Sequence, residues 1–205
     1  MRVLIACEES QAVCKAFRER GHEAFSSDIK PPSGGKPEWH IQGDVLGILN
    51  EGWDLMIAHP PCTYLTTTGA RWLYNKDGSK NEQRWKDREE ALVFVNCLLN
   101  APIPKIALEN PVGAISSEIK KPSQIIQPFW FGDSASKKTC LWLKNLPNLA
   151  PTSLVDVEYV TTSSGKRFSK WYWETSRLKG EARRAARSKT FQGIANAMAD
   201  QWGSL

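Results

Sequence analysis

Short apolar runs alternate with amphipathic segments along most of the chain, and this alternation is what most constrains the fold. The runs have the length and content of buried strands, and the segments between them carry apolar residues at helical spacing. Strands separated by helices pair in parallel, so we expect a mostly parallel α/β sheet. The expected strands are 2–7, 22–27, 53–58 and 105–109, and the expected helices are 11–20, 83–100 and about 190–202.

Length and cysteine content narrow the class of protein further. A chain of 205 residues matches one domain. Its five cysteines include no CxxC pair and no zinc-spaced cluster with histidine, so we expect free thiols in a reducing cytoplasm and no metal. The first apolar run, about five residues long, is too short for a signal peptide or a membrane span, so we expect no membrane partner.

Cys62 follows one of the predicted strands and is the sharpest chemical signal. Pro60 and Pro61 fix two backbone φ angles in front of it and aim its side chain rigidly, which suits a nucleophile. A thiol needs a positive neighbour to ionise at neutral pH, and the candidates for it are His59 and the pair Lys137 and Lys138. The alternative is a buried, inert cysteine. We assign that role to the other four, which are Cys7, Cys14, Cys97 and Cys140.

Acidic residues follow other predicted strands, at the edge where ligands of parallel sheets bind. Glu109 ends its strand, where partial burial would raise its pKa and let it protonate a ring nitrogen, or where it is an ordinary loop carboxylate. Asp28 and Asp44 are suitable acceptors for ribose hydroxyls and an adenine amine. Neither GxGxxG nor GxxxxGK[ST] occurs, which argues against a dinucleotide or a nucleoside triphosphate.

The segment 161–190 holds nine basic residues against two acidic ones, while the whole chain has a net charge of only +5. It also contains Phe168, Trp171, Tyr172 and Trp173. Basic and aromatic side chains together favour nucleic-acid binding. The alternative is a solvated, poorly ordered surface loop.

Taken together, the motifs resemble the DNA cytosine-C5 methyltransferases, and most of all the short phage and prophage members of that family. The similarity extends over nearly the whole chain and rests on four motifs in order, which are HPPCTYL, ALENP, FGDSASKKTCLWLKNLP and RSKTFQGIANAMADQW. It implies a Rossmann-like methyltransferase sheet with helices on both faces. It also implies S-adenosylmethionine as cofactor, DNA (duplex rather than single-stranded) as substrate, no obligate protein partner, and the cytoplasm of a bacterium or phage-infected cell.

The resemblance also assigns roles to matching positions. It implies that Cys62 attacks C6 of cytosine, that Glu109 contacts N3 and the 4-amino group, and that Lys137, Lys138 or both support a flipped base. The implied cofactor-binding residues are Cys7, Glu8, Ser10, Asp28, Asp44, Pro60 and Asn196. The expected substrate-binding residues are Pro61, Asn110, Arg71, Arg183, Arg184 and Trp171.

The sequence departs from the larger members of that family at four places, and one of them is Pro111, which stands where valine is usual. The glycine-rich loop after the first strand is replaced by CEES at 7–10, so the methionine end of the cofactor must be held differently, through Ser10 or backbone amides. Lysines replace arginines at 137–138, which changes a bidentate contact into a point charge. The basic insertion, about 152–188 in a single domain 1–205, is too small for a separate target-recognition domain, so we expect low or short-site specificity.

Other functions remain open at this stage. Methylation of an exocyclic amine is disfavoured, because His59 and Cys62 flank the two prolines where that chemistry has Asp, Asn or Ser and an aromatic residue. C5 chemistry on a free pyrimidine nucleotide or on a single strand is compatible with the missing recognition domain. A catalytically silent nucleic-acid-binding relative would use the basic segment alone.

Overall fold

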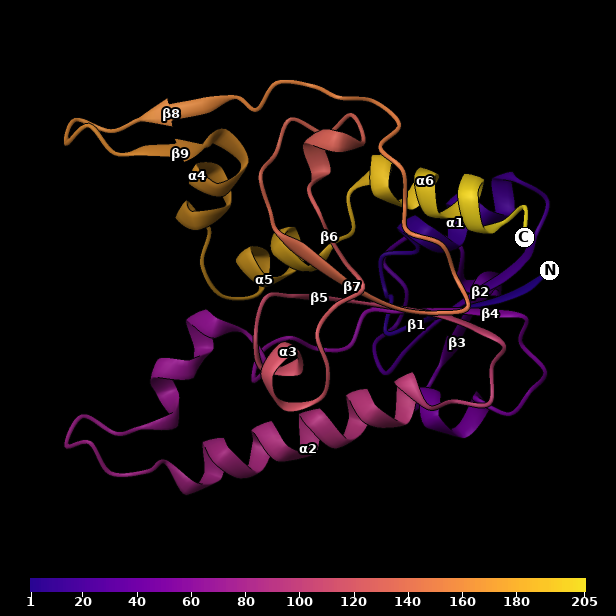
Figure 1. Ribbon diagram of the computed structural model, residues 1–205, viewed down its shortest axis with the longest axis horizontal. Helices are drawn as coiled ribbons and strands as arrows, with labels where there is room; N and C mark the ends of the chain where they lie inside the picture. Colours follow the sequence, from indigo (N-terminus) through magenta and orange to yellow (C-terminus); the bar gives the residue numbers. More distant parts are fainter.

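The computed structural model describes residues 1–205, and its elements follow the predicted alternation. The main strands are β1 (Arg2–Ala6), β2 (Glu23–Asp28), β3 (His40–Gln42), β4 (Leu55–Ala58), β5 (Lys105–Pro111), β6 (Gln124–Ile126) and β7 (Thr139–Lys144). They form one seven-stranded sheet in the order β3-β2-β1-β4-β5-β7-β6 (Figure 1). Strands β1 to β5 are parallel, and β7 runs antiparallel to both β5 and β6.

Helices cover both faces of this sheet, as Figure 1 shows. On one face lie α1 (Ala12–Glu19) and α6 (Gln192–Trp202), and on the other lie α2 (Glu82–Leu99) and α3 (Ala114–Glu118). Side chains of β1 alternate between the two layers, with Val3 and Ile5 in the first core and Leu4 and Ala6 in the second. Burial on both faces explains why the strands are continuous apolar runs.

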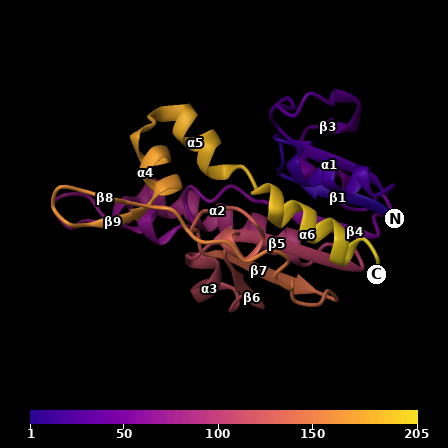
Figure 2. The ribbon, with the colours of Figure 1, turned by 90° about the horizontal axis from the view of Figure 1, so that it is seen from above.

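A small unit stands off one end of the sheet (Figures 1 and 2). It consists of β8 (Tyr159–Thr161), β9 (Arg167–Ser169), α4 (Lys170–Arg177) and α5 (Gly180–Ser188), and we call it the basic unit. Its aromatic side chains pack on one another, with the Phe168 ring 5.7 Å from Tyr172 and 6.1 Å from Trp173 between centroids. The basic segment is therefore folded, and the alternative of a poorly ordered loop is wrong.

Four short 3-10 turns complete the chain. They are η1 (Pro37–Trp39), η2 (Val45–Ile48), η3 (Thr67–Leu73) and η4 (Pro128–Trp130). Among all these elements, we find no helix with the length and apolar character needed to cross a bilayer.

Candidate active site

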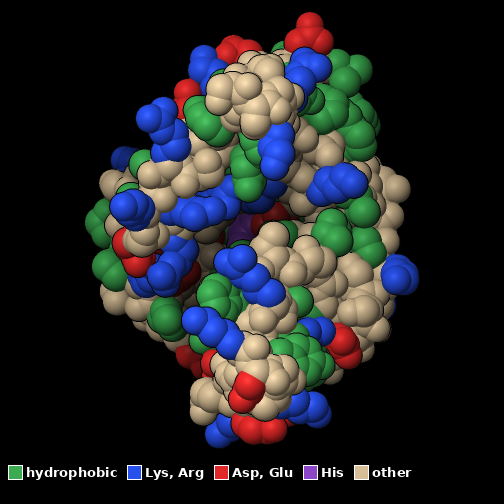
Figure 3. Space-filling model, turned by 90° about the vertical axis from the view of Figure 1, so that its left-hand side faces the viewer, with side chains coloured by type: hydrophobic (Ala, Val, Ile, Leu, Met, Phe, Trp, Pro, Cys, Tyr) green, Lys and Arg blue, Asp and Glu red, His purple; other side chains and the backbone are tan.

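A cavity of about 730 Å³ opens at the edge of the sheet where the parallel strands end. The residues after β1, β2, β3 and β4 line it, and α5 of the basic unit closes one side. Figure 3 shows a hollow on this side of the molecule, with a histidine and acidic side chains at its bottom and Lys and Arg side chains around its mouth. Predicted site residues in its lining are Cys7, Glu8, Ser10, Asp28, Asp44, Pro61, Cys62 and Arg184.

Cys62 is held at this cavity by its backbone neighbours. Its carbonyl oxygen accepts hydrogen bonds from the amides of Leu65 and Thr66, at 3.0 and 3.2 Å, so it begins a tight turn. Asn110 donates from Nδ2 to the carbonyl of Pro60 at 2.8 Å, which ties this turn to the end of β5. The thiol is consequently half-buried at a fixed place beside the end of β5.

Glu109 lies on β5 with its carboxylate paired to a histidine. Nδ1 of His59 is 3.2 Å from Oε2 of Glu109, and the two side chains are only 9% and 12% exposed. His59 was one of two candidates for the cation beside Cys62, but its hydrogen bond goes to Glu109. Nε2 of His59 is buried without a hydrogen-bond partner, and His59 lines the cavity.

The charges at this site shift the pKa values of Cys62 and Glu109 in opposite directions. Burial raises the pKa of the Cys62 thiol, the Glu109 carboxylate raises it further, and Lys137 opposes both. Burial also raises the pKa of Glu109, but the hydrogen bond with His59 and the charge of Lys137 outweigh it. The net pKa of Glu109 is lowered, so the expectation of a raised value is wrong.

The structure separates the two lysines before β7. Lys137 is half-buried, lowers the pKa of both Cys62 and Glu109, and donates from Nζ to the carbonyl of Arg187 at 3.1 Å. Lys138 is exposed and is not among the charges that shift either pKa. Lys137 is therefore the cation of this site.

The loop after β1, residues 7–11, has an unusual backbone conformation. Cys7 and Gln11 have φ angles of 59° and 58°, in the left-handed region that non-glycine residues rarely adopt. Glu8 is 4% exposed and accepts hydrogen bonds from the amides of Val13 and Cys14, at 2.7 and 3.1 Å. Its carboxylate therefore caps α1 from within the chain.

The two predicted cofactor aspartates lie on neighbouring strand ends. Asp28 accepts one hydrogen bond, from the amide of Lys30 at 2.9 Å, and Asp44 accepts one from the amide of Leu46 at 3.0 Å. Each carboxylate keeps a second oxygen free. Ser27, the residue before Asp28, also lines the cavity. Its Oγ is buried and has no hydrogen-bond partner.

Several predicted residues lie outside the cavity lining. Pro60 and Asn110 are buried behind it, and Asn196 on α6 accepts a hydrogen bond from Gln192. Arg71 is exposed on η3 over the ring of Trp72, at 4.7 Å. On the basic unit, Arg183 is exposed and Trp171 packs on Phe191 with 5.3 Å between ring centroids.

The cysteines are all free, as expected, but one is misassigned as buried. Cys97 is exposed, because it lies on the outer side of α2, where Val93 one turn earlier is 63% exposed. Cys14 and Cys140 are buried, and Cys7 is half-buried with a pKa raised to about 12 by burial and by Asp28 and Asp44.

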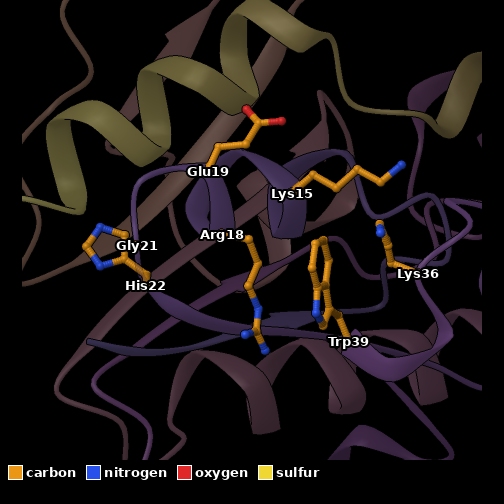
Figure 4. Close-up of a pocket in the computed structure, with 7 residues that line it drawn as sticks. All are labelled: Lys15, Arg18, Glu19, Gly21, His22, Lys36 and Trp39. Atoms are coloured by element: carbon orange, nitrogen blue, oxygen red, sulfur yellow. The ribbon is translucent and has the colours of Figure 1, made fainter.

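A second cavity, of about 510 Å³, lies between α1 and the segment before β3, at residues that precede β2 and β3. Figure 4 shows Arg18 and Trp39 side by side in it, with Glu19 pointing away from them. Its cations already have partners, since Arg18 donates to the carbonyl of Ala24 and Lys15 to that of Gly34. None of the predicted site residues lies there.

Sequence reasoning missed two features of the first cavity. The pairing of His59 with Glu109 joins residues fifty positions apart, and only the β4–β5 pairing places their strands side by side. The inward face of α5 has helical spacing at 181, 184, 185 and 188, but it is mostly polar and so gives no apolar periodicity.

The sheet order, the parallel strands β1 to β5, the antiparallel β7 and the helices on both faces make a Rossmann-like α/β sheet, which confirms the predicted fold class. No protein-family model and no curated protein sequence matches the chain. A solved structure that resembles it is a prophage-encoded E. coli protein described as a candidate DNA modification methyltransferase, with 13% identity and a TM-score of 0.46. The match covers 76% of this chain and 52% of that one, so the chain spans about half of that protein's length.

Proposed function

We propose that this protein methylates C5 of cytosine in DNA with S-adenosylmethionine, through a covalent adduct of Cys62 at C6. The supporting observation is that one cavity joins two aspartates at the ends of β2 and β3 to Cys62 after β4. Glu109 and Lys137 act on that thiol electrostatically from the neighbouring strand and loop. The second cavity, between α1 and the segment before β3, contains none of these residues.

The residues at the β2–β3 end fit the adenosine part of this cofactor. The free oxygens of Asp28 and Asp44 suit the ribose hydroxyls and the adenine amine, as acidic residues do in related sheets. The unpaired Oγ of Ser27 offers a further polar contact inside the same cavity. When bound, the cofactor supplies an electrophilic methyl group directed at the Cys62 end.

Cys62 and Glu109 divide the chemistry of the base between them. C5 of cytosine is a weak nucleophile, so the Cys62 thiolate first adds to C6 while N3 takes a proton, which makes C5 electron-rich. Glu109 contacts N3 and the 4-amino group, and the proton that leaves the Cys62 thiol reaches N3 through the Glu109 carboxylate, which lies 3.2 Å from Nδ1 of His59. After C5 takes the methyl group, its proton passes to water and the sulfur leaves C6 as a thiolate. N3 then gives its proton back through Glu109, which restores the ring and the free cysteine.

The basic unit provides the DNA contact in this proposal. A base inside a duplex is stacked, so it must be flipped out to reach Cys62 at the bottom of the hollow. The exposed basic side chains, among them Arg183, hold phosphates, while the aromatic side chains are largely used in packing the unit itself. Phosphate contacts carry little sequence information, which supports low or short-site specificity.

The test is incubation with methyl-labelled cofactor and, in parallel, duplex DNA, single-stranded DNA, RNA and dCMP, followed by nucleoside mass analysis. We expect 5-methylcytosine from duplex DNA, and none from the Cys62→Ala variant. Label on an exocyclic amine would exclude the Cys62 mechanism. Retention of DNA without any labelling would favour a silent binder, and labelling of dCMP or single strands alone would move the substrate away from duplex DNA.

A further inference from the structure

The start of α1 has no free amides for an anionic ligand. In sheets of this kind, the helix after the first strand offers its first N–H groups to an anion. Here the amides of Val13 and Cys14 are taken by the chain's own Glu8, whose two carboxylate oxygens are buried against them at 2.7 and 3.1 Å. A carboxylate on the cofactor therefore has to find a cation elsewhere in the cavity.

Helix α5 presents one face to the cavity over its whole length. Glu181, Arg184, Ala185 and Ser188 line it, at the i, i+3, i+4 and i+7 spacing of a single helical face. Near the start of the helix, Glu181 pairs with Lys30 at 3.1 Å, two residues beyond Asp28. At its end, the carbonyl of Arg187 accepts a hydrogen bond from Lys137. Arg184 thus lies between the start of α5, which is near Asp28, and the end of α5, which is near Lys137.

Arg184 is the cation of this lining that is best placed for a carboxylate. Lys30 is already hydrogen-bonded to Glu181, and Lys189 lies beyond the end of the helix. Arg184 only approaches Glu181, at 4.0 Å, without a hydrogen bond, and its side chain is 68% exposed. Its planar guanidinium can donate two parallel hydrogen bonds to one carboxylate.

We propose that Arg184 binds the carboxylate of the methionine moiety of the cofactor, in place of the N-terminal amides of α1. This inference rests on the proposed use of S-adenosylmethionine. With the adenosine held by Asp28 and Asp44, the amino-acid tail would reach Arg184 on α5, which lines the same cavity. The basic unit then serves both ligands, with Arg184 turned to the cofactor and Arg183 to DNA.

Calorimetric binding of two product analogues tests this assignment without any turnover. S-adenosylhomocysteine keeps the carboxylate, whereas 5′-methylthioadenosine lacks the amino-acid tail. We expect Arg184→Ala to weaken the affinity for S-adenosylhomocysteine at least tenfold, which is about 1.4 kcal/mol of binding free energy. The affinity for methylthioadenosine should stay unchanged. Arg184→Lys should recover part of the loss. Arg183→Ala is the matched control, because Arg183 is exposed and outside the lining, and both ligands should bind it normally.

The outcomes separate this inference from the proposed function. If Arg184→Ala binds S-adenosylhomocysteine as tightly as the unmodified protein, or weakens both ligands equally, Arg184 is not the carboxylate partner. A selective loss in Lys189→Ala instead would reassign the role and overturn the inference. If the unmodified protein binds neither ligand, the proposed cofactor itself is wrong.

Discussion

At Cys62, burial and two charged neighbours decide how readily the thiol ionises. Burial and the Glu109 carboxylate keep the proton on sulfur, and Lys137 favours its release. His59 acts on the other partner, because its hydrogen bond holds Glu109 in the ionised form. The free protein therefore has a protonated thiol beside an ionised carboxylate.

Cysteine alkylation as a function of pH measures this balance directly. In a Cys97→Ser background, which removes the exposed thiol, we expect iodoacetamide to modify Cys62 faster as the pH rises. Glu109→Gln removes a charge that raises the pKa of Cys62, so its rate profile should move to lower pH. Lys137→Ala should move the profile to higher pH, and Lys138→Ala should leave it in place. If the Glu109→Gln and Lys137→Ala profiles move in the same direction, or if neither moves, the charges assigned to Glu109 and Lys137 do not control the Cys62 thiol.

For single residues, the sequence predicts where a side chain lies in the fold better than it predicts the burial and the charges around that side chain. Two prolines before Cys62 and the strand before Glu109 suffice to place both side chains at the sheet edge. The pKa direction of Glu109 depends on His59 and Lys137, which approach it only through tertiary contacts. The exposure of Cys97 depends on which side of α2 packs on the sheet, and α2 has too little amphipathic contrast to show that side.

Among the elements, α6 illustrates how the last segment of the chain stabilises the first. Ile194, Met198 and Trp202 are at most 2% exposed and belong to the same core as α1 and β1. Nε1 of Trp202 donates to the carbonyl of Pro147 at 3.0 Å, so this large side chain is also satisfied. By contrast, Asp200 on the same helix faces solvent and pairs with Arg20.

Two substitutions in α6 should therefore differ strongly in their effect on stability. We expect Trp202→Ala to lower the free energy of unfolding by about 3–5 kcal/mol, because it leaves a large cavity in the core. Asp200→Ala should cost less than about 1 kcal/mol, since a partly exposed ion pair is screened by water. Urea denaturation of both variants gives the comparison. Equal losses would show that α6 is held by its surface contacts and not by its buried face.

The sequence predicts the central sheet and misses the elements of the basic unit, for a physical reason. Buried parallel strands need continuous apolar runs, so β1, β4 and β5 are visible in the sequence. Strands β8 and β9 have three residues each, and α5 has no buried residue. Local aromatic packing shapes this unit, and its elements are short and contain no continuous apolar run that would mark them in the sequence.

Across the whole molecule, the acidic groups of the cavity lie inside a basic mouth (Figure 3). In the proposed function, this arrangement would draw a polyanion to the carboxyl edge of the sheet and keep the carboxylates for the cofactor and the base. At the opposite edge of the sheet, Lys105 at the start of β5 is held by a hydrogen bond from its Nζ to the carbonyl of Leu205.

The affinity for duplex DNA should fall steeply with salt. Each phosphate contact contributes about −0.9 to the slope of log affinity against log salt, so Arg183→Ala should make the slope shallower by about that amount. Lys105→Ala is the control at the far edge and should leave the slope unchanged. Fluorescence anisotropy with a labelled duplex gives both slopes. An unchanged slope for Arg183→Ala would exclude this part of the basic unit from the DNA contact.

The central claim is the covalent bond between Cys62 and C6, and a duplex that contains 5-fluorocytosine tests it most directly. After methyl transfer, fluorine at C5 cannot leave as a proton does, so the sulfur stays attached to the base. With S-adenosylmethionine present, we predict a protein–DNA adduct that survives denaturation, maps to Cys62 by peptide mass analysis, and is absent in Cys62→Ser. An adduct at another residue, or methylation of ordinary DNA with no trapping at Cys62, would contradict the mechanism.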